Sequence, residues 1–244
     1  MDGVVLAAGE GTRMRPLTAE QPKGLVDVAG RPLLAHGFDA LRSVGVDRVV
    51  VVVGYRGADV VEHFGDSYRG TPLEYVRQDD RLGTAHALAQ ALPVVDPPLI
   101  VLNGDNVCRA NLDAVVRHHR ESDAAATLLV ERMSRETARQ TGVVETDAEG
   151  RVTGLVEKPD DPPSTLVTRG FYAFGGAIGL AIDEVTPSAR GEYELADAVD
   201  LLVQADQRVE TVELEGWCHN VNDPGDRAAV TDRLQSLDGT ENGE

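Results

Sequence analysis

The stretch Leu6-Ala-Ala-Gly-Glu-Gly-Thr-Arg-Met-Arg15 begins in the apolar run Val4 to Ala7 and ends with two arginines. A buried strand that ends in such small residues leaves its backbone uncovered, so peptide N–H groups can approach a polyphosphate. The stretch is not a dinucleotide-binding fingerprint, because Met14 stands where a third glycine would be, and it is not a Walker A loop. Two glycines alone are typical of an ordinary turn, but Arg13, Arg15 and Pro22-Lys23-Gly24 place cations beside this one. We therefore interpret the stretch as a phosphate-binding turn after the first strand.

Lysine is almost absent from the chain: of 23 basic residues, only Lys23 and Lys158 are lysines. Lys23 follows the glycine turn, and Lys158 lies in Val156-Glu-Lys-Pro159. An ammonium on a thin, flexible stem can reach a phosphate oxygen in a pocket that a planar guanidinium does not enter. We interpret both lysines as phosphate-binding residues; the alternative is that two lysines remain by chance.

The composition limits the partners of the chain. Among 244 residues, 41 Asp and Glu against 23 Lys and Arg give a net charge of −18. Nucleic acids and anionic membranes need a basic surface, so we expect neither as a partner. Abundant acidic residues, arginine in place of lysine and only 4% aromatic residues predict a halophilic protein dissolved in concentrated salt. No apolar stretch is long enough to span a membrane and no signal peptide is present, so we expect a cytoplasmic protein.

The two cysteines do not indicate a catalytic or metal-binding role. Cys108 and Cys218 are too few for a disulfide scaffold and lack the spacing of a zinc site. We expect both to be buried, unreactive thiols. No pairing of cysteine with histidine indicates a covalent nucleophile.

Apolar runs alternate with amphipathic segments, which is typical of a mostly parallel sheet covered by helices. In the first part we expect strands over 4–7, 48–53, 73–76, 99–102 and 124–130, and helices over 32–44, 58–64, 84–92 and 112–120. Beyond about residue 133 we expect strands over 142–146, 151–156, 166–174, 208–214 and 217–221, and helices over 177–184, 194–204 and 224–234. No repeat or long linker divides the chain, so we expect one domain over 1–234 and an acidic, disordered tail over 235–244.

Several segments together resemble one family. The segments are Leu6 to Thr18, Pro22-Lys-Gly-Leu-Val-Asp-Val-Ala-Gly-Arg-Pro-Leu33, Gly83-Thr-Ala-His-Ala87, Gly104-Asp105, Glu157-Lys-Pro159, Gly191-Glu-Tyr-Glu194 and the strand with Trp217. They are similar to the signatures of sugar-1-phosphate nucleotidylyltransferases, most of all the archaeal glucose-1-phosphate uridylyltransferases and thymidylyltransferases. The resemblance extends to about Arg233. It implies a Rossmann-like nucleotidyltransferase fold of the GT-A type: an α/β structure whose mixed, mainly parallel sheet is flanked by helices, with a small β-containing sugar-binding lobe.

The resemblance also implies a reaction and its residues. A sugar-1-phosphate oxygen attacks the α-phosphorus of a nucleoside triphosphate, and pyrophosphate leaves. Arg13 would hold the β- and γ-phosphates, Lys23 the α-phosphate region, and Lys158 the sugar phosphate. The nucleotide half, about 1–132, would bind through Ala7, Ala8, Gly9, Gly11, Thr12, Gln78, Gly83 and Thr84. The sugar-phosphate half, about 133–234, would bind through Gly142, Glu157, Lys158, Thr168 and Tyr172.

Asp105 is the best candidate ligand for Mg²⁺. It follows an expected central strand at the carboxyl end, where ligands of open α/β sheets collect, and Mg²⁺ prefers a few carboxylates plus phosphate oxygens. The second ligand of the resembled family is an aspartate, whereas this chain has Asn220 at that position. An amide oxygen can coordinate the ion but brings no charge, and Asp223 is the residue that would compensate.

The choice of substrates stays open. The segment from Gln78 to Leu82-Gly-Thr84 resembles the uridine-reading segment of uridylyltransferases, so we favour UTP over dTTP. Gln78 can offer a donor and an acceptor to the imide edge of a pyrimidine, but uracil and thymine share that edge, so dTTP stays open. Glucose 1-phosphate is favoured over N-acetylglucosamine 1-phosphate, because Thr168 replaces an asparagine that is common in enzymes for the latter. The alternatives are a non-catalytic regulatory subunit that binds nucleotide sugar and a glycosyltransferase on a related fold. A homo-oligomer is compatible with the sequence.

Overall fold

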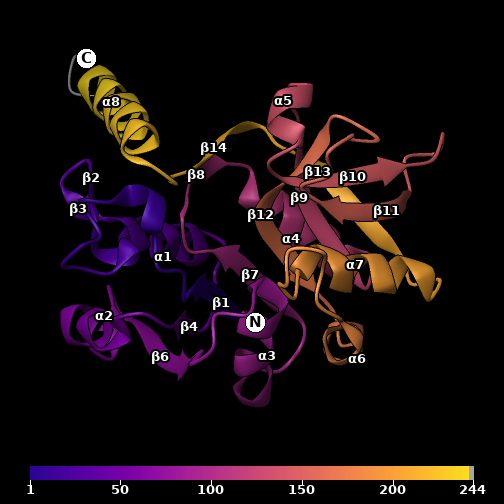
Figure 1. The fold of residues 1–244 in the computed structure, drawn as a ribbon, viewed down its shortest axis with the longest axis horizontal. Coiled ribbons are helices and arrows are strands. Elements are labelled where there is room, and N and C mark those ends of the chain that lie inside the picture. Colours follow the sequence, from indigo (N-terminus) through magenta and orange to yellow (C-terminus); the bar gives the residue numbers. More distant parts are fainter. Residues whose placement is uncertain (242–244) are drawn as a thin grey trace.

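Five consecutive valines form the strand β4 (Val49–Val53), and all five side chains are buried. β-Branched residues buried on both faces favour the middle of a parallel sheet. β4 pairs in parallel with β1 (Asp2–Ala7) and with β6 (Thr71–Arg77), and β1 pairs in parallel with β7 (Leu99–Asn103). The computed structural model describes residues 1–241, and Figure 1 shows this sheet with helices on both of its faces.

Two hydrophobic cores lie on the two faces of the sheet. One core contains Phe38 and the other Leu88, and both side chains are fully buried. The helices of the first face are α1 (Leu33–Ser43), α2 (Gly57–Phe64) and α4 (Leu112–Glu121). The helices of the second face are α3 (Thr84–Ala91), α6 (Ala177–Glu184) and α7 (Leu195–Gln204). The expected α/β fold with a mixed, mainly parallel sheet is confirmed.

The strand β12 (Leu166–Phe174) connects the two halves of the molecule, and all nine of its residues are buried. It pairs antiparallel with β7, with β9 (Ala126–Arg132) and with β10 (Gly142–Thr146). β11 (Val152–Glu157), β13 (Val209–Glu213) and the short β5 (Ser67–Tyr68) complete the sheet of ten strands. The parts of the chain before and after about residue 133 therefore share one continuous sheet.

Several short elements were not expected from the sequence. Strand β8 (Asn106–Ala110) pairs antiparallel with β14 (Gly216–Asn220), beside the main sheet. A hairpin joins β2 (Asp27–Val28) and β3 (Arg31–Pro32), and one further helix is α5 (Arg135–Ala138). Single 3₁₀ turns cover Thr12–Met14, Lys23–Leu25 and Leu92–Val94.

The last helix, α8 (Pro224–Glu241), begins at the expected proline but continues past the expected end. Val230 and Leu234 are buried, and the guanidinium of Arg233 lies 4.6 Å from the centre of the Trp217 ring. No proline or glycine follows within Gln235 to Leu237, so the helix continues into the polar stretch that we expected to be disordered. Residues 242–244 of that expected tail lie outside the described residues. Among the described residues, no helix combines the length and apolar character needed to cross a membrane.

Candidate active site

The strand order places a topological switch point at the carboxyl end of β1. β1 has β4 on one side and β7 on the other. The sheet therefore extends from β1 in one direction through β4 and in the opposite direction through β7. In open α/β sheets such a switch point is where ligands bind. The glycine turn follows β1 and Gly104-Asp105 follows β7, and the Gly104 amide donates to the Leu6 carbonyl at 2.9 Å. The two segments expected to bind phosphate and metal therefore meet.

The glycine turn packs directly against Lys23. Gly11 has a φ of 68°, and a methyl group added there would lie 2.9 Å from Cβ of Lys23. Thr18 Oγ1 donates to the Gly11 carbonyl at 2.8 Å, and Met14 is fully buried beneath the turn. Glycine at this position allows the left-handed backbone and leaves room for the lysine stem.

Three charged side chains expected to act together lie within one hydrogen-bonded group. Nζ of Lys23 is 2.9 Å from Oδ2 of Asp105 and 3.2 Å from Oδ1 of Asn222. Nη2 of Arg13 donates to the same Asn222 oxygen at 3.1 Å. Arg13, Lys23 and Asp105 are thus brought together as expected, and Asn222 is a member of the group that the sequence reasoning missed. The only sequence signal for it was its place two residues after Asn220.

The second candidate metal ligand lies on the strand next to Asp105. The Val221 amide donates to the Asp105 carbonyl at 2.8 Å, which fixes Asn220 beside the metal candidate. Asp223 is exposed, and its Oδ1 accepts from the Asp226 amide at 2.9 Å, so it caps helix α8. No group of three or more His, Cys, Asp or Glu side chains in the described part of the chain is arranged to hold a metal. Asp105 and Asn220, the two residues expected to hold Mg²⁺, would offer it one carboxylate and one amide oxygen.

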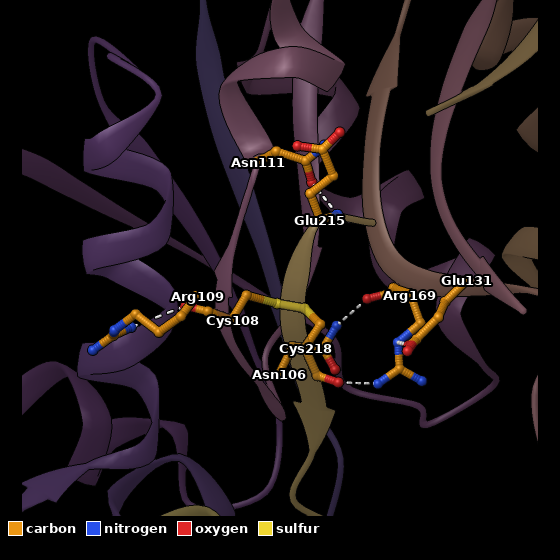
Figure 2. Close-up of a disulfide and its surroundings, with 8 residues drawn as sticks. All are labelled: Asn106, Cys108, Arg109, Asn111, Glu131, Arg169, Glu215 and Cys218. Atoms are coloured by element: carbon orange, nitrogen blue, oxygen red, sulfur yellow. Dashed lines mark hydrogen bonds and ion pairs between the residues drawn. A yellow bond between two sulfur atoms is a disulfide. The ribbon is translucent and has the colours of Figure 1, made fainter. Parts of the chain in front are cut away.

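A disulfide joins Cys108 and Cys218, which corrects the expectation of two unpaired thiols (Figure 2). The two residues face each other in the β8–β14 pair with their Cα atoms 4.1 Å apart. The expected burial of both cysteines is confirmed. The pairing was hidden because β8 was not foreseen and 110 residues separate the two positions. The bond links the strand that follows Asp105 to the strand that ends in Asn220.

A buried arginine supports this pair of strands from the side of the sheet (Figure 2). Arg169 is 6% exposed, and its guanidinium donates to the Cys218 carbonyl and lies 3.2 Å from the carboxylate of Glu131. The side-chain amide of Asn106 donates from Nδ2 to the Arg169 carbonyl at 2.6 Å. Burial lowers the pKa of Arg169, and the charge of Glu131 opposes this. Sequence reasoning missed Arg169, because its partners lie on three different strands.

The Gly83 turn is held by a segment from the second half of the chain. Gly83 has a φ of 114°, and a methyl group there would lie 2.4 Å from the Tyr193 carbonyl oxygen. The Leu195 amide donates to Thr84 Oγ1 at 2.9 Å. Gln78 is buried, and its amide nitrogen lies 3.0 Å from the Gly83 carbonyl and 2.9 Å from Nδ1 of His86. In this structure the donor capacity of Gln78, which we expected to face a base, is directed to the turn.

The expected sugar-binding residues gather on neighbouring strands. Tyr172 Oη donates to Thr168 Oγ1 at 3.3 Å, and a methyl group on Gly142 would lie 3.0 Å from that Thr168 oxygen and 3.1 Å from Oε2 of Glu157. Nζ of Lys158 is 3.0 Å from Oε1 of Glu157. Burial raises the pKa of Tyr172, as do the charges of Glu157 and Asp105. Gly142, Glu157, Thr168 and Tyr172 therefore form one cluster. The charge of Asp105 also acts on Tyr172.

Comparison with known proteins identifies the fold and family. A family model for nucleotidyl transferases matches residues 2–227. The chain belongs to the nucleotidyl transferase family. This nucleotidyl transferase is 44% identical over 235 residues to the UTP–glucose-1-phosphate uridylyltransferase AglF of Haloferax volcanii, covering 96% of this chain and 97% of that protein. The resemblance found in the sequence is confirmed.

Two further relatives of this nucleotidyl transferase differ in how much they share. A glucose-1-phosphate thymidylyltransferase of Streptomyces griseus is 36% identical over 237 residues, and the chain spans 64% of its length. The crystal structure of a UDP-glucose pyrophosphorylase complexed with UDP-glucose matches with a TM-score of 0.87 at 21% identity, covering 97% of this chain and 98% of that one. The structural match confirms the Rossmann-like nucleotidyltransferase fold.

Proposed function

We propose that this nucleotidyl transferase moves the uridylyl group of UTP to glucose 1-phosphate, forming UDP-glucose and pyrophosphate. The observation that carries the proposal is the meeting of Arg13, Lys23 and Asp105 beside the glycine turn at the switch point. The activity named for the Haloferax volcanii relative, at 44% identity over nearly the whole chain, supports the same reaction.

The proposed chemistry needs positioning and charge neutralisation more than covalent help from the protein. A phosphate oxygen of glucose 1-phosphate forms a bond to the α-phosphorus, and the bond from that phosphorus to the bridging oxygen of the β-phosphate breaks. The electron pair leaves with pyrophosphate, so no protein side chain has to accept a proton. Lys23 and Arg13 would stabilise charge on the triphosphate, and Lys158 would hold the incoming sugar phosphate.

We propose that Asp105 and Asn220 hold Mg²⁺, which supplies positive charge to the triphosphate when bound. One carboxylate and one amide oxygen fit an ion that keeps most of its shell for water and phosphate oxygens. In the structure the Asp105 carboxylate is 25% exposed and paired with Lys23. Lys23 would compete with the ion for this carboxylate until a triphosphate drew its ammonium away, so we expect metal binding to depend on nucleotide.

We propose glucose as the sugar, because Thr168 stands where enzymes for N-acetylglucosamine 1-phosphate commonly have an asparagine. The Thr168 hydroxyl and the Glu157 carboxylate both lie beside Gly142, so they can offer a donor and an acceptor to the hydroxyl groups of a sugar. The base is less restricted, since uracil and thymine differ by one methyl group, worth about 1 kcal/mol in a pocket. dTTP is thus the alternative donor, and the thymidylyltransferase among the relatives supports testing it.

Location and salt form part of the proposal. We propose a cytoplasmic enzyme adapted to concentrated salt, supported by the net charge of −18 and by a relative from Haloferax volcanii. The substrates are soluble metabolites, which agrees with that location.

A pyrophosphate-release assay tests the proposed reaction. The purified chain is mixed with Mg²⁺, one triphosphate and one sugar 1-phosphate in molar salt, over a panel of both substrates. We expect the highest kcat/KM with UTP and glucose 1-phosphate, and lower values with dTTP or N-acetylglucosamine 1-phosphate. Binding of UDP-glucose without pyrophosphate release from any pair would indicate the regulatory-subunit alternative and contradict the proposal.

A further inference from the structure

Asn222 lies between the two cations of the site. Its Oδ1 accepts from Nη2 of Arg13 at 3.1 Å and from Nζ of Lys23 at 3.2 Å. Arg13 is on the turn after β1, Lys23 is on the loop that follows, and Asn222 is on the connection from β14 to α8. One neutral oxygen thus holds together two positive groups from a distant part of the chain.

Hydrogen bonds at the start of α8 fix the position of Asn222. The Asn222 backbone amide donates to Oδ2 of Asp226 at 2.8 Å, and the Asp223 amide donates to the same oxygen at 3.3 Å. In return, the Asp226 amide donates to Oδ1 of Asp223 at 2.9 Å. Such reciprocal capping fixes the entry to a helix. Asn222 is therefore anchored at the start of α8, an 18-residue helix.

The Asn222 side chain carries no charge, and this limits how strongly it holds Arg13 and Lys23. A carboxylate at the same place would form charge-assisted bonds with Arg13 and Lys23, and these are about twice as strong as bonds to a neutral oxygen. Asp105 already supplies one carboxylate to Lys23. A second one would leave the cations paired within the protein and less available to a triphosphate. An amide orders the same two groups but yields to an anionic phosphate oxygen.

We propose that Asn222 is a positioning residue that sets the affinity for the triphosphate, by holding Arg13 and Lys23 in place without neutralising them. The inference rests on the proposed nucleotidyl transfer, since it assigns the two cations to the triphosphate. It is separate from the role of Asn220, which concerns the metal.

The variant Asn222→Asp tests the charge and keeps the shape. We expect its KM for UTP to rise about tenfold or more, with little change in KM for glucose 1-phosphate and an unchanged unfolding midpoint. Asn222→Ala removes the acceptor without adding charge, so its KM for UTP should rise less than in Asn222→Asp. The matched control is Gln207→Glu, which makes the same amide-to-carboxylate change on an exposed turn and should leave both KM values as in the wild type.

Two outcomes would overturn the inference. If Asn222→Asp keeps the wild-type KM for UTP, or lowers the Mg²⁺ concentration needed at unchanged KM, the side chain does not act on the cations. If Asn222→Ala raises the KM for UTP as much as Asn222→Asp does, charge is not the determinant. Direct calorimetric titration of UTP onto the variants keeps the test valid even if the wild type turns over no sugar phosphate. Failure of the proposed function is therefore distinguishable from failure of this inference.

Discussion

At the scale of single residues, the contacts of Lys23 restrict which basic side chain can stand at this position. Its stem packs beside Gly11, and its ammonium reaches both Asp105 and Asn222. A guanidinium is wider and planar and does not fit this space in the same way. The choice of lysine in an arginine-rich chain therefore has a geometric explanation at this position.

The first prediction follows from that geometry. Lys23→Ala should lower kcat by about a hundredfold or more, because it removes a group that stabilises transition-state charge. Lys23→Arg should recover little of that loss, because a wide, planar guanidinium does not replace a compact ammonium at Asp105 and Asn222. Steady-state pyrophosphate release measures both variants, and circular dichroism checks that they are folded. Wild-type rates in either variant would remove Lys23 from the mechanism.

A variant of Lys158 tests the binding of glucose 1-phosphate separately from the binding of UTP. Its φ is 47°, a left-handed conformation that asparagine tolerates, so Lys158→Asn removes the charge with little backbone strain. We expect a KM for glucose 1-phosphate raised about tenfold or more and a KM for UTP changed far less. Equal increases for both substrates would place this lysine elsewhere in the site.

The sequence could predict some site residues and not others. Arg13, Lys23 and Asp105 stand in local patterns next to expected strand ends, so their meeting followed from the topology of a parallel sheet. Asn222 is more than 190 residues from both of its cation partners, and no periodic pattern connects such positions. Arg169 was missed for the same reason.

At the scale of elements, long apolar runs were predictable and short polar strands were not. The five valines of β4 and the nine buried residues of β12 have a clear hydrophobic pattern, and both strands were expected. Strand β8 begins with Asn106 and ends in the exposed Arg109 and the half-buried Ala110, so nothing in its sequence separates it from a loop. Its pairing with β14 is set by tertiary contacts, among them the disulfide and Arg169.

The disulfide between β8 and β14 should stabilise the candidate metal site. We expect the double variant Cys108→Ala and Cys218→Ala to lose about 2–5 kcal/mol of unfolding free energy, the usual cost of removing such a bond. The Mg²⁺ concentration for half-maximal rate should also rise, because the bond links the strands beside Asp105 and Asn220. Chemical denaturation and Mg²⁺ titration measure the two effects.

A reducing dithiol provides the control for that prediction. It should change the wild type in the same direction as the double variant and should leave the double variant unchanged. A wild type whose stability and Mg²⁺ requirement do not respond to reduction would show that the disulfide does not support the site.

At the scale of the whole molecule, the charge balance predicts a strong dependence on salt. With a net charge of −18, the folded chain repels itself unless counterions screen the surface. The Debye length falls from about 10 Å at 0.1 M to about 3 Å at 1 M salt. We expect the unfolding midpoint and kcat to rise over that interval in KCl. A midpoint that is constant or falls with salt would contradict the proposed adaptation.

The central claim is that the uridylyl group moves from UTP to glucose 1-phosphate at the Lys23–Asp105 site. The most direct measurement follows UTP labelled at the α-phosphate, incubated with glucose 1-phosphate and Mg²⁺ in molar salt. We predict that the label appears in UDP-glucose in a one-to-one ratio with pyrophosphate released, and that Lys23→Ala nearly abolishes the transfer. Label that stays in UTP, or appears only in UMP or UDP, would contradict the account.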